Sequence, residues 1–297
     1  WPAIAGKPVG PEQVRALPAR DADGRCITAA RCAMELALSD AIAPPAAVAP
    51  IRARVSGVLG SADPDRTARR LRWMRLYGLR DFKLKLGFGY EIDRANLAAV
   101  DRRIGRAIAR GRCTLRVDVN GGWDAASAPE RVEELAQYGV CAVEQPVYGP
   151  PEALADLAAR CTLPLIADES LRTGDDARVL LAAGAKVWWN LRISKNGGLT
   201  LAADLARLAA GRGVPLVVGC MVGESGILSA AQRRLLTGIP QPRFVEGNYG
   251  RFLLSDDLTT PSPRFGYGGR LGPPPKALRV NADKLARYGT LLATLEA

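Results

Sequence analysis

The motif FKLKLG at residues 82–87 reads as a short strand that carries two lysines on one side. In an extended chain, residues two apart point the same way, so Lys83 and Lys85 share one face and the apolar residues take the other. Lysines that face water would make this an ordinary edge strand. Lysines that face the inside of the protein need a reason to be there.

Short apolar runs of strand character alternate with helix-like segments from about residue 51 onward. Eight such runs are centred near residues 57, 84, 117, 143, 166, 191, 217 and 246, about 23 to 33 residues apart. That spacing accommodates a strand, its loops and a crossover helix, and eight such units close into a (β/α)8-type barrel. A Pro- and Gly-rich segment at 260–275 stands where the last helix would be. We therefore expect an α/β fold with a TIM-like, modified (β/α)7β barrel.

Composition limits the chemistry. The formal net charge is +11 and histidine is absent. Without histidine, Ser-His and Cys-His triads are excluded, and proton transfer falls to lysine, carboxylates, tyrosine, cysteine or metal-bound water. The excess charge is mostly arginine scattered along amphipathic segments, without a basic block interleaved with aromatic residues. We therefore expect no nucleic-acid partner and an anionic small molecule as ligand.

The apolar runs and the cysteines both favour a cytoplasmic protein. No run approaches the roughly 18 to 20 apolar residues that a bilayer crossing needs, so we expect no membrane contact. The six cysteines form no CxxC pair. Such scattered cysteines indicate reduced thiols rather than a zinc site or a disulfide framework.

Acidic side chains stand at the ends of three successive predicted strands. Asp118 ends the third, Glu144 the fourth and Asp168 the fifth, each in an otherwise apolar run. The C-terminal ends of barrel strands form the functional face, so these acids should meet around one point. Three oxygen ligands that leave room for water or substrate suit Mg²⁺. The sequence therefore predicts a magnesium site.

This site would lie beside the strand of the FKLKLG motif, so both lysines would project into the barrel mouth. A divalent cation, a second ammonium and partial desolvation all disfavour protonated lysine, so one of the two could act as a neutral base near pH 7. A metal that binds a substrate carboxylate stabilises the enediolate formed when the α-proton leaves. The motif thus predicts proton abstraction next to a carboxylate.

Six motifs follow one another along the chain: FKLKLG, LRVDVNGGWD, AVEQP, IADES, SKNGGL and GCMVGESGILSAA. In this order and spacing they resemble the enolase superfamily, in particular its mandelate racemase/muconate-lactonizing-enzyme branch, over about residues 27–256. The resemblance implies Mg²⁺ at Asp118, Glu144 and Asp168. It also implies Lys85 as the base, with Lys83 beside it to lower its pKa and to touch the substrate carboxylate.

The chain departs from the pattern of this branch on the sixth strand. The branch usually carries a second catalytic lysine five residues before a Gly-Gly pair, but here that position is Arg192, and Lys195 lies three residues later. Guanidinium is a poor base and a good partner for a carboxylate or oxyanion, so a one-base reaction fits better than racemisation. The rival assignment makes Lys195 the second base. If Asn190 and Arg192 face the barrel, strand alternation turns Lys195 away from it, unless a bulge intervenes.

Four further residues near the strand ends are candidates to support the site or to contact substrate: Asn120, Glu169, Glu224 and Glu246. Glu169 would orient a neighbour or a lysine. For Glu224 and Glu246, a role as a helix-start acid or salt-bridge partner stands beside the substrate-contacting role.

The resemblance also implies a domain arrangement. The family precedes its barrel with an α+β capping domain that closes over the substrate, and residues 1–50 resemble only the last helices of that domain. We expect this remnant of a cap at 1–50, the barrel with its metal site at 51–271, and a C-terminal segment at 272–297 that packs back on the cap. Family members also suggest a homo-oligomer.

The expected function is Mg²⁺-dependent abstraction of a proton α to a carboxylate through an enediolate intermediate. A lyase (dehydratase) or isomerase (cycloisomerase) of a small carboxylic acid fits best. One alternative is a racemase or epimerase of an amino-acid derivative or dipeptide with two opposed bases. Another is a barrel that has lost catalysis and binds a metal and an acid, which Arg192 and the reduced cap make credible.

Overall fold

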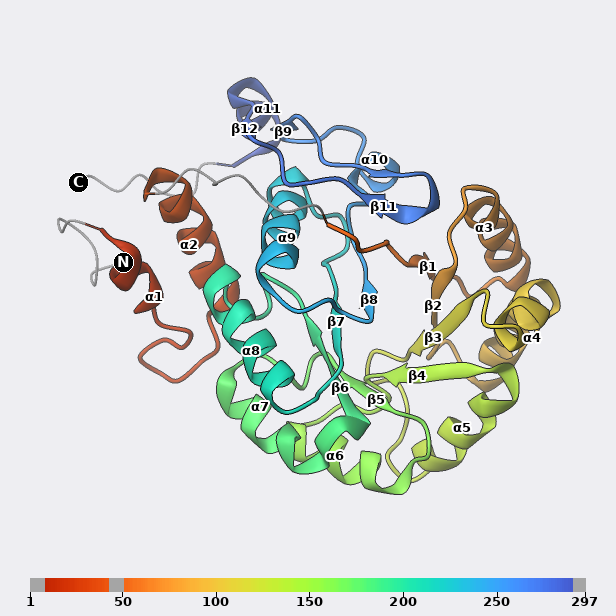
Figure 1. Ribbon diagram of the computed structural model, residues 1–297. Helices are drawn as coiled ribbons and strands as arrows, with labels where there is room; N and C mark the ends of the chain where they lie inside the picture. Colours follow the sequence, from red (N-terminus) through yellow and green to blue (C-terminus); the bar gives the residue numbers. More distant parts are fainter. Residues whose placement is uncertain (1–8, 43–50, 291–297) are drawn as a thin grey trace.

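The computed structural model describes residues 9–42 and 51–290, and its centre is an eight-stranded parallel barrel (Figure 1). Each strand pairs with the next one in the chain. The last strand meets the first, because Val55, just before β1, pairs in parallel with Val245 of β8. The predicted α/β, TIM-like barrel is confirmed. Its strands are β1 (Gly57–Leu59), β2 (Asp81–Lys85), β3 (Thr114–Asp118), β4 (Val140–Glu144), β5 (Leu165–Ala167), β6 (Val187–Leu191), β7 (Leu216–Val218) and β8 (Phe244–Val245).

Helices follow the first seven strands and surround the barrel (Figure 1). They are α3 (Pro64–Leu76), α4 (Tyr90–Ala109), α5 (Ala128–Glu134) with the 3-10 helix η1 (Leu135–Tyr138), α6 (Pro151–Arg160), α7 (Gly174–Leu180) with η2 (Leu181–Lys186), α8 (Leu199–Gly211) and α9 (Gly226–Gly238). After β8 comes only the four-residue α10 (Gly250–Leu253) before the chain leaves the barrel. This short last unit is the expected departure from eight full repeats.

Local sequence signals explain where these helices begin and end, as α3 illustrates. The Asp63 side chain accepts hydrogen bonds from the amides of Asp65 (2.9 Å) and Arg66 (3.2 Å), which lack partners within the helix. A proline in the first turn has no amide that needs a partner. Gly78, with φ of 84°, then turns the chain toward β2.

The apolar core has two parts. The larger part lies between the outer faces of the strands and the helices, and includes Phe82 and Leu84 of β2. The smaller part fills the interior of the barrel near the N-terminal ends of the strands. Its buried members come from β4 to β8: Ala142, Ile166, Trp188, Val217 and Phe244. Because this inner layer is apolar, the charged interior side chains lie above it, toward the C-terminal strand ends.

The chain segments before and after the barrel lie on its outside. The helices α1 (Pro11–Arg15) and α2 (Thr28–Ile42) lie next to α8 (Figure 1). The C-terminal part contains β9 (Thr259–Thr260), β10 (Phe265–Gly266), η3 (Tyr267–Gly269), β11 (Arg270–Leu271), β12 (Arg279–Val280) and α11 (Ala282–Tyr288).

The predicted division into domains stays a prediction. The proposed boundary at residue 50 lies outside the described residues, as do 291–297 of the C-terminal segment. In its described part, that segment pairs through β12 with β9, and the Lys284 ammonium contacts the Asp256 carboxylate at 2.5 Å. All six cysteines are free thiols. Within 9–42 and 51–290, no helix combines the length and the apolar character that crossing a membrane demands.

Candidate active site

Lys83 of β2 lies inside the barrel and contacts three carboxylates. Its Nζ is 3.1 Å from Asp118 Oδ2 of β3, 3.2 Å from Glu144 Oε1 of β4 and 2.7 Å from Glu246 Oε2, just after β8. The lysine is 3% exposed, and its neighbours along the strand, Phe82 and Leu84, are buried on the opposite face. Lys83 therefore faces the inside of the barrel, and three carboxylates surround its ammonium.

The electrostatics of this cluster keep Lys83 charged. Burial by itself lowers the pKa of Lys83, but the charges of Glu144, Glu246 and Asp118 together outweigh it and raise the pKa above the ordinary lysine range. Lys83 therefore acts as a fixed ammonium that neutralises its neighbours, not as the neutral amine that a base must be.

Arg116 of β3 extends the charged layer across the barrel. Its guanidinium donates to Glu246 Oε1 and to Ser56 Oγ, both at 3.0 Å, and is completely buried. It also lies over the Phe244 ring, 4.2 Å from the ring centroid, so it sits directly on the inner apolar layer. Glu246 is thus held between Arg116 and Lys83, as the salt-bridge alternative for this residue expected.

Lys85 lies two residues after Lys83, at the end of β2 and at the mouth of the barrel. Its Nζ donates to Asn120 Oδ1 at 3.2 Å, and the side chain is half-buried. Asn120 adopts a left-handed backbone with φ of 49°, and its amide donates to Asp118 Oδ1 at 3.1 Å. Lys85 therefore lies beside the acid cluster with one side-chain partner among the described residues.

Arg192 approaches the acids from the end of β6. Its guanidinium contacts the Asp168 carboxylate and lies 3.6 Å from Glu144 Oε1. The side chain is 14% exposed. Arg192 thus faces the barrel interior and brings a positive charge between two of the predicted metal ligands.

Lys195 also reaches the site, and the strand alternation that would turn it away does not apply. The strand β6 ends at Leu191, and the chain turns back over the next residues. Lys195 Nζ lies 3.1 Å from Asp168 Oδ1 and donates to three backbone carbonyls: those of Asp168 (2.7 Å), Leu171 (2.8 Å) and Asn190 (2.8 Å). Burial, and then the charge of Arg192, lower its pKa well below the ordinary value.

Two side chains that were given no role in the prediction hold the acids in place. Gln145 Oε1 accepts hydrogen bonds from the amides of Asp168 (3.0 Å) and Ser170 (3.1 Å). Asn190 Nδ2 donates to Glu144 Oε1 at 2.9 Å. The signal for Gln145 was its position directly after a strand-end acid, and Asn190 has the interior parity of Arg192.

Glu224 and Glu169 are the two remaining candidates. Glu224 Oε1 accepts a 2.7 Å hydrogen bond from the Met221 amide in the loop after β7. Burial raises the pKa of Glu224 to about 7, although the Met221 hydrogen bond and the Arg192 charge oppose the shift. Glu169 Oε2 is buried without a hydrogen-bond partner among the described residues. Its charge acts on Lys195, where it opposes the lowering of the pKa.

The three predicted metal ligands are separated by protein cations. No three acidic or cysteine side chains in the described part of the chain converge closely enough to form a metal site unaided. Lys83 contacts Asp118 and Glu144, and Arg192 contacts Glu144 and Asp168. Both carboxylate oxygens of Asp168 are buried and ion-paired, Oδ1 with Lys195 and Oδ2 with Arg192. Three buried carboxylates that attract positive charge into the space between them fit a hard cation such as Mg²⁺.

Comparison with known proteins shows which family this chain is similar to. A family model described as enolase C-terminal domain-like matches residues 66–276. An N-succinyl-L-Arg/Lys racemase of Bacillus cereus is 34% identical over 179 residues, which are 60% of this chain and 47% of that protein. Muconate cycloisomerase 1 of Pseudomonas putida is 31% identical over 189 residues, 63% of this chain and 48% of that protein. The chain thus spans about half the length of these curated relatives.

A solved structure of a muconate lactonizing enzyme matches the fold with a TM-score of 0.82 and 26% sequence identity. The match covers 97% of this chain and 82% of that one. The similarity therefore includes most of the segments outside the barrel.

Proposed function

Because this chain belongs to the enolase superfamily, in its mandelate racemase/muconate-lactonizing-enzyme branch, we propose that it is an enzyme that removes the proton α to the carboxylate of a small carboxylic acid. The proposal rests on the buried acids at the C-terminal strand ends and on a lysine at the barrel mouth beside them. The matches to the curated relatives span about half of the length of those proteins, so the activity of the whole enzyme belongs to the proposal.

Asp118, Glu144 and Asp168 would hold Mg²⁺. The ion would bind the substrate carboxylate and stabilise the negative charge that develops when the α-proton leaves. Lys83 keeps Asp118 and Glu144 close together by neutralising part of their repulsion. Arg192, whose guanidinium already binds carboxylates, would pair with a substrate anion.

Lys85 takes the proton in this proposal. It lies at the mouth of the barrel, where a substrate can reach it, and its Nζ contacts only the Asn120 side-chain oxygen among the described partners. Lys83 is unsuited to the task because three carboxylates hold its proton. The two lysines of β2 therefore have different roles, one structural and one chemical.

A one-base reaction, β-elimination or cycloisomerisation, is the form that the geometry supports best. The observation that carries it is the environment of Lys195, which donates to the carbonyls of Asp168, Leu171 and Asn190. An ammonium has three hydrogens, so these bonds use all of them. Lys195 then fixes the ends of β5 and β6 and is not free to exchange a proton with a substrate.

A racemase or epimerase is the second candidate, and one observation favours it. Burial and the Arg192 charge lower the pKa of Lys195, and a neutral Lys195 would release its carbonyl contacts and could act opposite Lys85. One of the relatives is named as a racemase of N-succinylated amino acids. In this case both stereoisomers of the substrate should exchange their α-proton.

Exchange of the α-proton with deuterium oxide tests the proposal and separates these candidates. The substrates offered would be dicarboxylic acids and both stereoisomers of N-acyl amino acids and dipeptides, each with Mg²⁺. We expect exchange that disappears on addition of EDTA and in Lys85→Ala, and that persists in Lys186→Ala, an exposed lysine of η2. Exchange from one stereoisomer alone supports the one-base reaction.

Two outcomes contradict parts of the proposal. Exchange from both stereoisomers that requires Lys195 would replace the one-base reaction with racemisation. Binding of Mg²⁺ and an acid without any exchange across the set would mean that the barrel binds its ligand without catalysis. We further propose that the protein works in the cytoplasm and forms a homo-oligomer. Light scattering of the purified chain measures its oligomeric state.

A further inference from the structure

Two adjoining hollows open at the N-terminal ends of the barrel strands, opposite the candidate active site. Their volumes are about 230 Å³ and about 280 Å³, and Arg54, which precedes β1, lines both. Neither is lined by a residue of the acid cluster. Any ligand in them would therefore be separate from the proposed reaction.

The larger hollow, which we call the arginine hollow, is lined by cationic side chains and contains no acidic one. The residues that line it are Arg54, Arg75, Gly78, Arg80, Tyr267, Gly268 and Arg270. Four guanidinium groups around a space of about 280 Å³ repel one another, and the lining offers no carboxylate to offset this. Such an arrangement has a net attraction for anions.

Arg54 and Arg270 make the repulsion most direct. They are partners in an antiparallel bridge between the segment before β1 and β11. Residues directly opposite in such a pair have neighbouring side chains, and like charges there are destabilising. Both side chains are exposed, and neither has an ion-pair partner among the described residues. An anion bound between them would remove the repulsion.

The rest of the hollow is held in place by the fold. Arg75 NH1 donates to the Leu79 carbonyl at 3.1 Å, which fixes its guanidinium. Tyr267 packs against Gly78 so closely that an added Cβ would lie 2.8 Å from its ring. The Gly268 amide donates to the Tyr77 carbonyl at 2.8 Å. Because the Gly78 amide also donates, to the Arg75 carbonyl, neither glycine of the lining has a free amide, and the four arginines are the charged donors that a ligand would meet.

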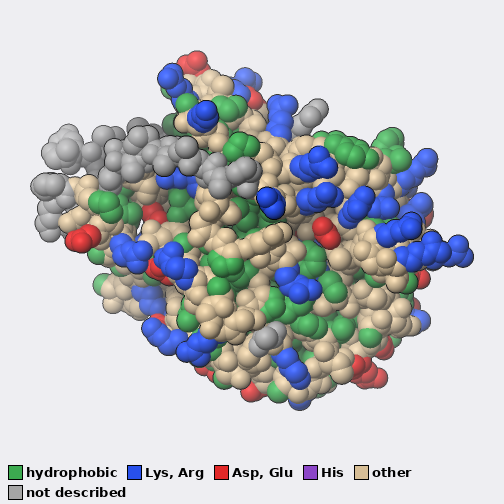
Figure 2. Space-filling model, viewed as in Figure 1, with side chains coloured by type: hydrophobic (Ala, Val, Ile, Leu, Met, Phe, Trp, Pro, Cys, Tyr) green, Lys and Arg blue, Asp and Glu red, His purple; other side chains and the backbone are tan. Residues whose placement is uncertain are grey.

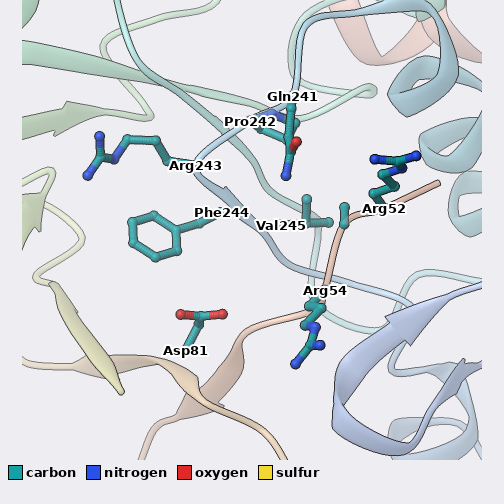
Figure 3. A pocket seen from close by; sticks show the side chains of 9 residues that line it. Arg52, Arg54, Asp81, Gln241, Pro242, Arg243, Phe244 and Val245 are labelled. Carbon is teal, nitrogen blue, oxygen red and sulfur yellow. The ribbon is translucent and has the colours of Figure 1, made fainter. Parts of the chain in front are cut away.

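The smaller hollow adds positive charge beside the arginine hollow. Figure 3 shows Arg52, Arg54 and Asp81 around this space, with Arg243 extending on the far side of β8 from Arg52. Asp81 is the acidic residue that lines the smaller hollow, and its carboxylate already accepts a 2.7 Å hydrogen bond from Thr114 Oγ1. Figure 2 shows Lys and Arg side chains gathered over this side of the molecule, between β11 and α3.

We propose that the arginine hollow binds a small anion that carries a phosphate or diphosphate group. Guanidinium forms paired, charge-assisted hydrogen bonds with phosphate oxygens, and several arginines around one space match the several charges of such a group. A space of about 280 Å³ is below the range of roughly 300–1,000 Å³ typical of drug-sized ligands, so the ligand is small. The site goes beyond the proposed reaction and does not depend on it.

Calorimetric titration with inorganic pyrophosphate, in buffer without Mg²⁺, tests the proposal. We expect saturable binding at one site that is about tenfold weaker in Arg54→Gln and in Arg270→Gln, because each loses charge-assisted hydrogen bonds. Arg72→Gln is the matched control, since Arg72 is exposed on α3, lines neither hollow and carries the same charge. It should bind pyrophosphate like the unaltered protein. Circular dichroism checks that all variants are folded.

Three results would overturn the proposal. The first is an equal loss of affinity in Arg72→Gln, which would reduce the effect to net charge. The second is that pyrophosphate gives no heat of binding, or only the heat that sodium chloride of equal ionic strength also gives. The third is that the protein binds duplex DNA but not pyrophosphate, and that Arg54→Gln and Arg270→Gln weaken the DNA binding. This face would then be a nucleic-acid surface instead.

Discussion

Replacing Arg31 by methionine should destabilise the protein strongly, because this buried arginine of α2 joins the N-terminal segment to the loop after β6. All five of its N–H groups are used. Nε donates to the Leu17 carbonyl at 2.8 Å, NH1 to Glu35 Oε2 at 2.5 Å and to the Gly197 carbonyl, and NH2 to the carbonyls of Val14 at 3.3 Å and Arg15 at 3.1 Å. Its side chain has 0% exposure.

The size of the effect follows from what the substitution leaves behind. Glu35, 1% exposed, would lose its counter-charge while its other oxygen still accepts from the Thr200 amide (2.7 Å) and hydroxyl (2.6 Å). Removing one partner of a buried pair costs about 3 to 5 kcal/mol. Methionine fills much of the same space, so the loss measures charge and hydrogen bonds rather than a cavity. Adding Glu35→Gln removes the buried charge and should restore part of the stability.

Urea unfolding followed by circular dichroism measures the difference. The control is Arg207→Met, which breaks an ion pair with Asp204 between side chains that are 56% and 38% exposed. Exposed pairs contribute about 0 to 1 kcal/mol, so this variant should remain close to the unaltered protein. If Arg31→Met loses no more stability than Arg207→Met, the inference that Arg31 anchors the N-terminal segment is wrong.

Three further predictions concern the site. Gln145→Ala leaves the amides of Asp168 and Ser170 without their acceptor, which should cost about 1 to 3 kcal/mol in urea unfolding. It should also weaken Mg²⁺ binding about 10- to 100-fold, measured by calorimetry, and an unchanged Mg²⁺ affinity would argue against a positioning role for Gln145. Burial raises the pKa of Glu224 from 4.5 to about 7 in the folded protein, so the folded state binds more protons than the unfolded state between these two pH values, and the free energy of unfolding should fall as pH rises from 4.5 to 7. Glu224→Gln should remove this pH dependence in urea unfolding, and an unaltered dependence would assign it to another group. Lys83→Met leaves three buried carboxylates without their shared cation, so it should cost about 3 to 5 kcal/mol in urea unfolding. A loss no larger than that of Arg207→Met would contradict this.

The barrel and the position of its acids were predictable because both depend on local regularities. The spacing of the apolar runs leaves room for one helix between strands, and parallel strands in chain order then need no further information. Residue alternation along β2 put Lys83 and Lys85 on one face, and the acids on the neighbouring strands indicated that this face lies inside the barrel, where Lys83 is found. The same rule was misleading for Lys195, because it holds only while the strand continues, and β6 ends at Leu191.

The amino-acid order alone was therefore enough to establish the alternating strands and helices, the family, and the acids at three neighbouring strand ends. The folded arrangement settled which charges meet: Lys83 with three carboxylates, Arg192 with Asp168, and Arg116 with Glu246. The reason is physical. Periodicity and spacing are properties of a short stretch of chain, whereas an ion pair depends on the distance between side-chain atoms from strands 130 residues apart, as in Arg116 and Glu246.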